Sequence, residues 1–450
     1  MENDIELTVH DLANNGCGVA KDPATGKILF IPDSVPGDRL TVTITADHKN
    51  YAEAEIYDTI AYSPNRIVPD CILSGVCGGC CFRHIRYETE LTAKENFIRS
   101  AFSQAKMESI EMKPMIGSPL LSGYRNKAEF AVRRGSDGQL RIGFTQRGSH
   151  EVINLPDCRI LPPEFIAIKE KVRGLMNQYS ITAFDEESGE GEVRHLILRK
   201  SGINGKLLLC FVVNGKTLTK EKELCAELQS AFPEISSIYL NENTESAGMV
   251  MAERSRLLKG NARLSDRIRN VPVQIGPQSF FQVNTPAAEL LYETIKDFAD
   301  VKKNETILDL YCGMGTIGLS LAGDCRHLIG CEIIDEAVQS TKHNAAAMGL
   351  RNTEFLKGDA GKIAEKLAGK GNKPDVIILD PPRKGCDRKT LDAVIAMSPS
   401  RIVSVSCNPS TAARDAAYLR NAGYTLGPIQ GVDLFPRTQH VETVVLLSKG

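Results

Sequence analysis

The amino-acid sequence predicts an α/β protein whose C-terminal part, residues 271–450, forms a doubly wound and mainly parallel sheet. Short apolar runs alternate there with helical stretches, which is the pattern of strand–helix–strand units. Residues 1–60 instead alternate apolar and polar positions in short runs separated by turn residues, as in a small closed β-barrel. Residues 61–270 mix strands and helices, so we expect an α+β region between the other two.

The composition sets limits on this interpretation. A chain of 450 residues is too long for one hydrophobic core, and the boundaries above predict three domains. The N-terminal stretch lacks the basic and apolar parts of an export signal, and the longest apolar run, residues 207–213, is too short to cross a bilayer. We therefore expect a cytoplasmic protein without membrane contact. Its 13 cysteines are then expected to be metal ligands, catalysts or core residues instead of disulfides.

The charge distribution points in two directions about a nucleic-acid partner. The net charge of −2 argues weakly against one, and residues 1–60 are strongly acidic. Residues 118–149 and 253–269, however, are rich in arginine and lysine. Either stretch alone is best explained as a solvated face. Two such stretches beside a catalytic region could instead form a groove that follows phosphates.

A glycine-rich loop closes the first strand of the C-terminal sheet. The segment Asp309-Leu-Tyr-Cys-Gly-Met-Gly-Thr-Ile-Gly318 ends a strand and opens a helix, and its glycines let a ligand approach the backbone. Glu332 ends the next strand, where its carboxylate could accept hydrogen bonds from ribose hydroxyls. This pattern predicts an adenosine-containing cofactor, but by itself it fits NAD as well as S-adenosylmethionine (SAM).

The later strand ends favour SAM. Ligands of an open α/β sheet lie beyond the carboxyl ends of the strands, and this chain places Asp359, Asp380 and Cys407 at such ends. Asp380 is followed by two prolines, which is typical of the substrate loop of SAM-dependent methyltransferases. Enzymes that methylate an exocyclic amine usually have an aromatic residue next, where this chain has Arg383. The acceptor is therefore expected to be something other than an amine.

If the acceptor is a carbon of a pyrimidine ring, the reaction requires a thiol nucleophile, and Cys407 could supply it. C5 of uracil attacks a methyl sulfonium only after a thiolate has added to C6, and a base must then remove the C5 proton. Cys407 stands before Asn408 and Pro409 at a strand end, and Glu442 is the one carboxylate on an otherwise apolar strand. Taken singly, such a cysteine is usually a core residue and such a glutamate is usually solvated.

The motifs together resemble a known family, the RNA uracil-5-methyltransferases. They are Ser-Cys-Asn-Pro at 406–409, Asp-Pro-Pro-Arg-Lys-Gly at 380–385, the glycine loop at 309–318, Phe-x-Gln-Val-Asn at 280–284 and His-Val-Glu-Thr-Val at 440–444. The resemblance covers essentially the whole chain and implies a Rossmann-like class I methyltransferase domain. It implies that Cys407 is the nucleophile and Glu442 the base. It further implies SAM contacts from Gln282, Tyr311, Gly313, Glu332, Asp359 and Asp380, and stacking of a base on Phe280 or Phe281.

A cluster of cysteines predicts a metal site. Cys71, Cys77 and Cys80 follow the spacing C-x5-C-x2-C with a flexible Gly-Gly, and Cys158 lies in a separate loop. Such thiols suit an iron–sulfur cluster, with a zinc site as the structural alternative. The resemblance favours a 4Fe-4S cluster on these four cysteines, as in the branch of the family that methylates ribosomal RNA, although Cys81 could replace Cys80.

The N-terminal barrel resembles a TRAM domain, an OB-like RNA-binding module that also belongs to that branch. The resemblance therefore implies 23S ribosomal RNA as partner, in single-stranded or loop form, with the target uracil flipped out of its stack. Nothing in the sequence requires a protein partner. The alternatives are the same chemistry on tRNA, a non-catalytic iron–sulfur RNA-binding protein and a radical-SAM methylthiotransferase. The last is disfavoured because those enzymes need C-x3-C-x2-C and a C-terminal TRAM module.

Overall fold

The computed structural model describes residues 4–245 and 249–449. Its contacts divide the chain into two compact units. The first unit comprises residues 1–118, 381–386 and 404–450, and the second comprises residues 119–380 and 387–403. Each unit is described by itself. Within the described residues, no helix is both long and apolar enough to span a membrane.

The first unit begins with the predicted barrel. Its sheet has the order β1-β5-β6-β4-β3-β2, formed by β1 (Asp4–Thr8), β2 (Asp11–Leu12), β3 (Gly18–Lys21), β4 (Ile28–Ile31), β5 (Arg39–Asp47) and β6 (Tyr51–Ala61). Strands β1 and β2 are separate, because the amide of Val9 between them donates to the carbonyl of Asp38. The amide of His10 then donates to the carbonyl of Val19, which closes the barrel over apolar residues such as Leu29 and Leu40.

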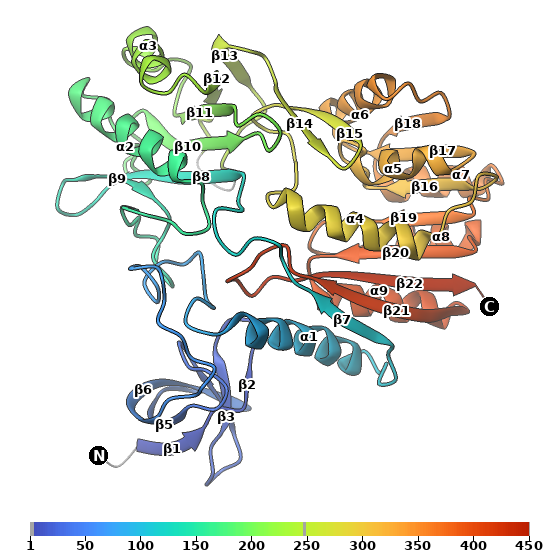
Figure 1. The fold of residues 1–450 in the computed structure, drawn as a ribbon, viewed down its shortest axis with the longest axis horizontal. Coiled ribbons are helices and arrows are strands. Elements are labelled where there is room, and N and C mark those ends of the chain that lie inside the picture. Colours follow the sequence, from blue (N-terminus) through green and yellow to red (C-terminus); the bar gives the residue numbers. More distant parts are fainter. Residues whose placement is uncertain (1–3, 246–248, 450) are drawn as a thin grey trace. The chain divides into compact units, whose positions relative to one another are not determined.

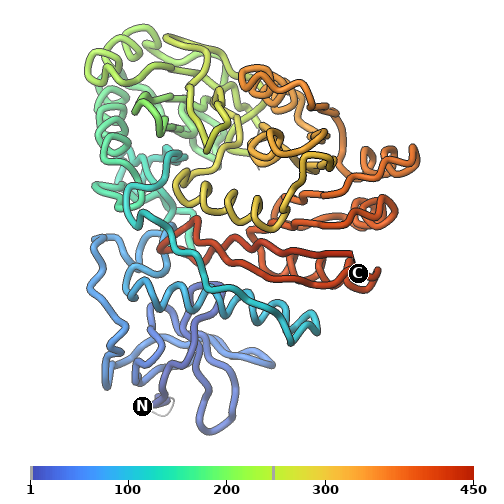
Figure 2. Tube along the Cα trace, turned by 45° about the vertical axis from the view of Figure 1, so that its right-hand side comes forward, coloured from blue at the N-terminus to red at the C-terminus, as the bar shows by residue number. Residues whose placement is uncertain are grey.

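The long helix of the first unit is α1 (Tyr87–Gln104). It buries Ile98 and Phe102 as its apolar pattern predicts, but it also buries two charged residues, Glu90 and Lys94. Strand β7 (Met112–Ile116) follows and pairs in parallel with β21 (Tyr424–Val432), far away in the sequence (Figures 1 and 2).

The C-terminal elements complete the first unit. Strand β20 (Arg401–Ser406) leads into it, helix α9 (Pro409–Asn421) follows, and β21 pairs antiparallel with β22 (Glu442–Lys449). The sequence pattern did not predict β21, because Pro428 and two glycines interrupt it. In the structure the register shifts between Leu426 and Ile429, at this proline. Helix α9 and helix α1 pack against each other within the unit.

The second unit opens with a mixed six-stranded sheet of order β13-β12-β11-β10-β8-β9. Its strands are β8 (Lys127–Arg134), β9 (Leu140–Gly143), β10 (Val193–Lys200), β11 (Leu207–Val213), β12 (Ile235–Glu242) and β13 (Ser255–Gly260), with helices α2 (Pro163–Gln178) and α3 (Glu221–Ala231). Only β11 and β12 pair in parallel among the registers of this sheet, and α3 connects them. A hairpin of β14 (Leu264–Ile268) and β15 (Val271–Ile275) ends this region.

Four parallel strands form the predicted cofactor sheet of the second unit. Their order is β18-β17-β16-β19, formed by β16 (Thr306–Leu310), β17 (His327–Glu332), β18 (Thr353–Lys357) and β19 (Val376–Leu379). The helices around them are α4 (Thr285–Ala299), α5 (Thr316–Leu321), the short 3-10 helix η1 (Ala322–Asp324), α6 (Asp335–Ala347), α7 (Ala360–Gly369) and α8 (Arg388–Met397). The parallel pairing confirms the doubly wound pattern expected from the apolar runs.

Candidate cofactor site and catalytic loop

The glycine loop between β16 and α5 has an unusual backbone. Tyr311 lies in the left-handed region with φ of +66°, and Gly313 and Gly315 have φ of +55° and +76°. A tyrosine in this region is strained, and such strain is typical of functional loops. The amide of Cys312 donates to the carbonyl of Cys331 at 2.9 Å, which joins the loop to the end of β17.

Helix α5 approaches the strand so closely that its Gly318 has no room for a side chain. A Cβ at this position would lie 2.6 Å from Oδ2 of Asp309. The amide of Gly318 donates to the same Oδ2 at 3.0 Å. The third glycine of the loop is therefore required by packing, whereas the first two set the turn.

Glu332 holds the glycine loop from the end of β17. Its Oε2 accepts a hydrogen bond from the amide of Gly313 at 3.0 Å, and its Oε1 accepts one from Ile334 at 2.8 Å. From α6, the hydroxyl of Thr341 donates to the carbonyl of Gly313 at 2.9 Å. The carboxylate is thus oriented before any ligand binds, and its remaining lone pairs can accept ribose hydroxyls.

Two carboxyl groups stand at the ends of the neighbouring strands β16 and β19. Asp309 is 1% exposed, and its Oδ1 has no hydrogen-bond partner. Burial raises the pKa of Asp309 to about 8, assisted by the charges of Asp380 and Glu332 and opposed by the Gly318 amide. Burial likewise raises the pKa of Asp380 to about 7, although part of this residue remains exposed. These groups favour a cation beside them, such as a sulfonium.

The remaining predicted cofactor residues also lie in the second unit. Asp359 is exposed and caps α7, with its Oδ1 accepting from the amide of Lys362 at 3.1 Å. The carbonyl of Gln282 accepts from Nδ2 of Asn126 at 2.9 Å, which fixes the backbone of the Phe-x-Gln-Val-Asn motif. Within this motif Phe280 is 71% exposed and Phe281 is 5% exposed, so of these two rings that of Phe280 is open to solvent.

Sequence reasoning missed several residues that support this site. Thr390, fully buried at the start of α8, shares a hydrogen bond of 3.3 Å with the hydroxyl of Tyr311. Asn126 holds Gln282 as described, and Ile333 and Ile334 are each 60% exposed directly after Glu332, where apolar surface could cover an adenine. Two isoleucines directly after an acidic strand end are a signal that could have been found in the sequence. A threonine in a helix gives no such signal.

The proposed nucleophile lies in the first unit, where β20 passes into α9. Cys407 is half-buried. Asn408 caps the helix, with its Oδ1 accepting from the amide of Ser410 at 3.1 Å, and Pro409 occupies the first helical position. Oγ of Ser406 accepts from the amide of Asn408 at 3.1 Å, so the residues on both sides of the thiol are fixed.

Helix α9 also anchors the loop that follows Asp380. The buried Asp415 accepts at Oδ2 from the amide of Cys386 at 2.8 Å, and Arg414 donates to the Cys386 carbonyl at 3.0 Å. A Cβ on Gly385 would lie 2.8 Å from that same Oδ2. The loop after Asp380 is therefore bonded to the middle of the helix whose start follows Cys407, and Arg383 of this loop is exposed.

The proposed base, Glu442, begins β22 in the same unit and is 7% exposed. A tightly bonded segment, residues 433–441, leads to it from the end of β21. We call this segment the base loop. Its Asp433 is fully buried.

The cysteine segment lies in the first unit, and Cys158 lies in the second. Cys71, Cys77 and Cys80 are half-buried, as is Cys158. Nearby, Arg83 binds Asp70 through two hydrogen bonds of 2.8 and 2.9 Å. Burial lowers the pKa of Arg83, but Asp70 and the thiols of Cys80 and Cys71 outweigh it, and the pKa is raised. In the described part of the chain, no three His, Cys, Asp or Glu side chains are assembled for a metal.

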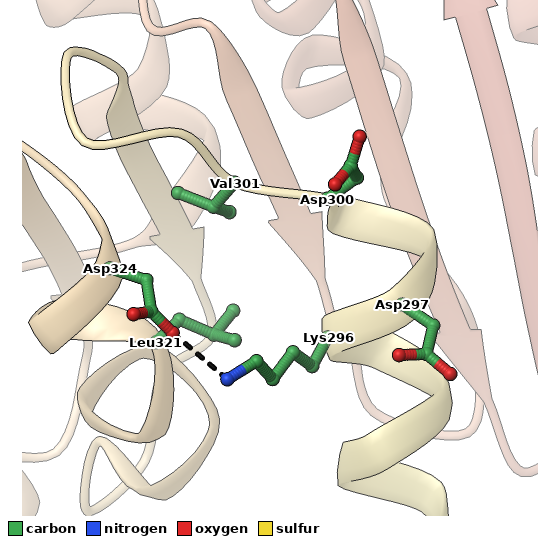
Figure 3. A pocket seen from close by; sticks show the side chains of 6 residues that line it. All are labelled: Lys296, Asp297, Asp300, Val301, Leu321 and Asp324. Atoms are coloured by element: carbon green, nitrogen blue, oxygen red, sulfur yellow. Dashed lines mark hydrogen bonds and ion pairs between the residues drawn. The ribbon is translucent and has the colours of Figure 1, made fainter.

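A separate pocket of about 220 Å³ lies beside α4, where the ion pair between Lys296 and Asp324 spans 2.9 Å (Figure 3). It borders the segment that leads to the amino end of β16. Ligands of an open α/β sheet bind at the opposite, carboxyl ends. This pocket is therefore distinct from the cofactor site.

A parallel sheet with this glycine loop and these strand-end acids defines a SAM-dependent methyltransferase, and comparisons with known proteins identify the family. The profile described as tRNA (Uracil-5-)-methyltransferase matches residues 86–450, and the TRAM domain profile matches residues 4–57. The chain belongs to this family and is a SAM-dependent RNA uracil-5-methyltransferase with an N-terminal TRAM domain.

Similar proteins cover the whole chain. An RNA methyltransferase of Halalkalibacterium halodurans is 35% identical over 99% of this chain and 97% of its own length. One of Nostoc sp. is 36% identical over 98% of this chain and 96% of its own. The structure of the Pyrococcus abyssi tRNA (uracil-54, C5)-methyltransferase with S-adenosyl-L-homocysteine (SAH) has a TM-score of 0.79 and 24% identity, covering 98% of this chain and 100% of that one. This structure supports the fold.

Proposed function

We propose that this enzyme methylates C5 of a specific uracil in 23S ribosomal RNA through a covalent bond between Cys407 and C6. The observation that carries the proposal is the placement of a half-buried thiol between β20 and α9, on the helix that also anchors the Asp-Pro-Pro-Arg loop. Cys407 lies within residues 86–450, which match the family profile.

In the proposed reaction, the Cys407 thiolate adds to C6 of the uracil and C5 becomes nucleophilic. C5 then takes the methyl group from SAM, which leaves as SAH. The Glu442 carboxylate removes the C5 proton, and the electron pair of that C–H bond restores the C5–C6 double bond as the sulfur leaves C6. The product is 5-methyluridine, and the thiolate is regenerated.

We assign the binding of SAM to residues of the second unit. Tyr311, Gly313 and Glu332 would hold the ribose and methionine parts, and Asp359 would lie near the adenine. Gln282 and Asp380 would lie near the sulfonium, and Phe280 would stack on a base of the RNA because its ring is exposed.

The choice of ribosomal RNA rests on the cysteines and the TRAM domain. We propose that Cys71, Cys77, Cys80 and Cys158 would hold a 4Fe-4S cluster with a structural role, because each is a free, half-buried thiol and thiolates are the ligands of such clusters. The thiol of Cys81 donates to Oε1 of Gln439 at 3.3 Å and packs against Gly16, which supports Cys80 as the third ligand. The tRNA alternative is favoured by the name of the family profile. We keep cytoplasmic location and independence of a protein partner as predictions.

The test is to trap the covalent intermediate. Full-length enzyme is incubated with SAM and 5-fluorouridine-substituted fragments of 23S rRNA, or with tRNA treated in the same way. With fluorine at C5 there is no proton for the base to remove, so the sulfur cannot leave C6. An adduct that resists denaturation is therefore expected with rRNA. It should disappear in Cys407→Ala and persist in Cys225→Ala, which removes a buried cysteine of α3.

Each other result has a defined meaning. An adduct with tRNA alone would retain the chemistry and replace the substrate. Absence of an adduct with both RNAs, from protein that binds SAM, would overturn the proposed mechanism.

A further inference from the structure

The base loop, residues 433–441, is bound to helix α1 by buried charged side chains. Nζ of Lys94 donates to Oε1 of Glu90 and to Oδ1 of Asp433, both at 2.8 Å, and to the carbonyl of Phe435 at 3.2 Å. The side chains of Lys94, Glu90 and Asp433 have no exposed surface. One lysine of α1 thus holds two positions of the segment that leads to Glu442.

Three further hydrogen bonds reach the loop, two from the same helix and one from Ile85 just before it. The hydroxyl of Tyr87 donates to Oδ2 of Asp433 at 2.7 Å. The amide of Arg437 donates to Oε1 of Glu90 at 2.7 Å, and its guanidinium donates to the carbonyl of Ile85 at 2.9 Å. Arg437 adopts the left-handed conformation, with φ of +72°, so this point of the loop is held against its own preference.

The opposite side of the loop is bound by backbone groups. The carbonyl of Arg437 accepts from the amides of Cys81 and Phe82 at 3.0 and 3.1 Å. Within the loop, the amide of Phe435 donates to Oδ1 of Asp433 at 3.1 Å and the hydroxyl of Thr438 donates to the Phe435 carbonyl at 2.8 Å. The path of the chain from Asp433 to Thr438 is therefore fixed at every turn.

Packing alone does not require these charges. Buried ion pairs are often replaceable by apolar residues of equal volume without loss of stability, and their best-supported role is to select one arrangement. Here the two carboxylates come from different segments, α1 and the base loop, and both need the same ammonium group. The cluster consequently tolerates one position of the loop relative to α1.

We propose that Lys94 is a positioning residue for the catalytic base, acting through Asp433 and the base loop to hold Glu442 where it can reach the C5 proton. This inference rests on the proposed function, in which Glu442 is the base. Lys94 itself touches neither RNA nor SAM in this proposal.

The chemistry gives this role a distinctive consequence. Attack by Cys407 and transfer of the methyl group precede any use of the base. If Glu442 is misplaced, C5 keeps its proton, the sulfur cannot leave C6, and methylated RNA remains bonded to Cys407. A misfolded enzyme would instead form no bond at all.

The test uses the full-length Lys94→Met variant with ordinary uridine RNA and SAM labelled in its methyl group. We expect a denaturation-resistant protein–RNA adduct that carries the label, which the wild type does not accumulate. Release of methylated RNA should fall about 100-fold, the range for loss of a general base, while the first methyl transfer falls less than about tenfold. Tyr87→Phe removes the hydrogen bond to Asp433 and the one that the Tyr87 hydroxyl accepts from the amide of Ser118, but it leaves Lys94 in place. This variant should show a smaller accumulation and serves if Lys94→Met fails to fold.

Lys169→Met is the matched control. Lys169 lies on α2 of the second unit, and its side chain is equally unexposed and contacts Glu170 and Asn154. This variant should lose stability without accumulating adduct.

Two results would overturn the proposal. In the first, Lys94→Met and Tyr87→Phe release methylated RNA and retain adduct in the same ratio as the wild type. In the second, adduct and released product both fall by the same factor. Glu442→Gln separates this from failure of the proposed function. If it accumulates no adduct on ordinary RNA while the wild type is trapped by 5-fluorouridine, the assignment of the base is wrong, whatever Lys94 does.

Discussion

At the scale of single residues, Asp309 and Asp380 show how the cofactor site is prepared. Both pKa values are raised by burial above the ordinary value of 3.8, to about 8 and about 7. The unfolded chain therefore ionises first, and the two groups reduce the free energy of unfolding as pH rises from about 4 to about 8. A sulfonium cation beside them would favour the ionised forms and recover part of this loss.

This predicts that the preference for SAM over SAH depends on pH. SAM carries the sulfonium and SAH does not, so SAM binding should release protons and tighten relative to SAH between about pH 6 and about pH 9. A shift of one pKa unit in either carboxyl corresponds to about tenfold in the affinity ratio. Calorimetric titration of both ligands measures it, and Asp380→Asn should flatten the dependence. Identical pH profiles for the two ligands would contradict it.

At the scale of elements, helix α9 connects to two segments of the proposed active site, the one at Cys407 and the loop that follows Asp380. Its first turn follows Cys407, and its Asp415 binds the amide of Cys386. Burial raises the pKa of Asp415, while that amide and Arg414 lower it, and the net shift is upward. Removing the carboxylate leaves a buried amide without its acceptor, which costs about 1–3 kcal/mol.

We therefore expect Asp415→Ala to lower both the free energy of unfolding, by that amount, and the rate of adduct formation with 5-fluorouridine RNA. SAM affinity should change less than about twofold, because the proposed SAM residues other than the strand-end Asp380 are held by different elements. Urea unfolding and single-turnover trapping measure the two effects. The control is Glu365→Ala at an exposed position of α7, which should alter neither the free energy of unfolding nor the rate of adduct formation. A large loss of SAM binding in Asp415→Ala would refute this division of roles.

Local sequence patterns predicted those elements whose conformation depends on their own residues. The apolar runs predicted the parallel strands, and the glycine spacing predicted the loop after β16, because the conformation of each depends on its own residues. Strand β21 was missed because Pro428 breaks its pattern, and one of the two strands that pair with it, β7, is distant in sequence. The buried Lys94 was missed for a related reason: a charged residue on a helix is expected in water unless its partner, here Asp433, is already known.

At the scale of the whole molecule, the cysteines test the assignment to the iron–sulfur branch. Protein purified without oxygen is expected to contain about four iron and four sulfide per chain. Cys71→Ser and Cys158→Ser should each lower the iron content, whereas Cys81→Ser should retain it. Elemental analysis and visible absorption measure this. One zinc per chain with no sulfide would support the structural alternative, and no metal in protein that binds SAM would reject a resident cluster.

The first unit is built from segments that are far apart in the sequence, and this affects when it can fold during synthesis. Helix α1 and strand β7 emerge from the ribosome long before β21, with which β7 pairs, and before β22, which pairs with β21. At typical rates of synthesis, about 15–60 s pass between Ser118 and Asp433. The barrel has its own apolar core and can fold at once, whereas Lys94 and Glu90 must wait in solvent. The first unit, which carries the thiol of the proposed nucleophile Cys407, can therefore be completed only after β21 and β22 have been made, long after its own helix α1 and strand β7.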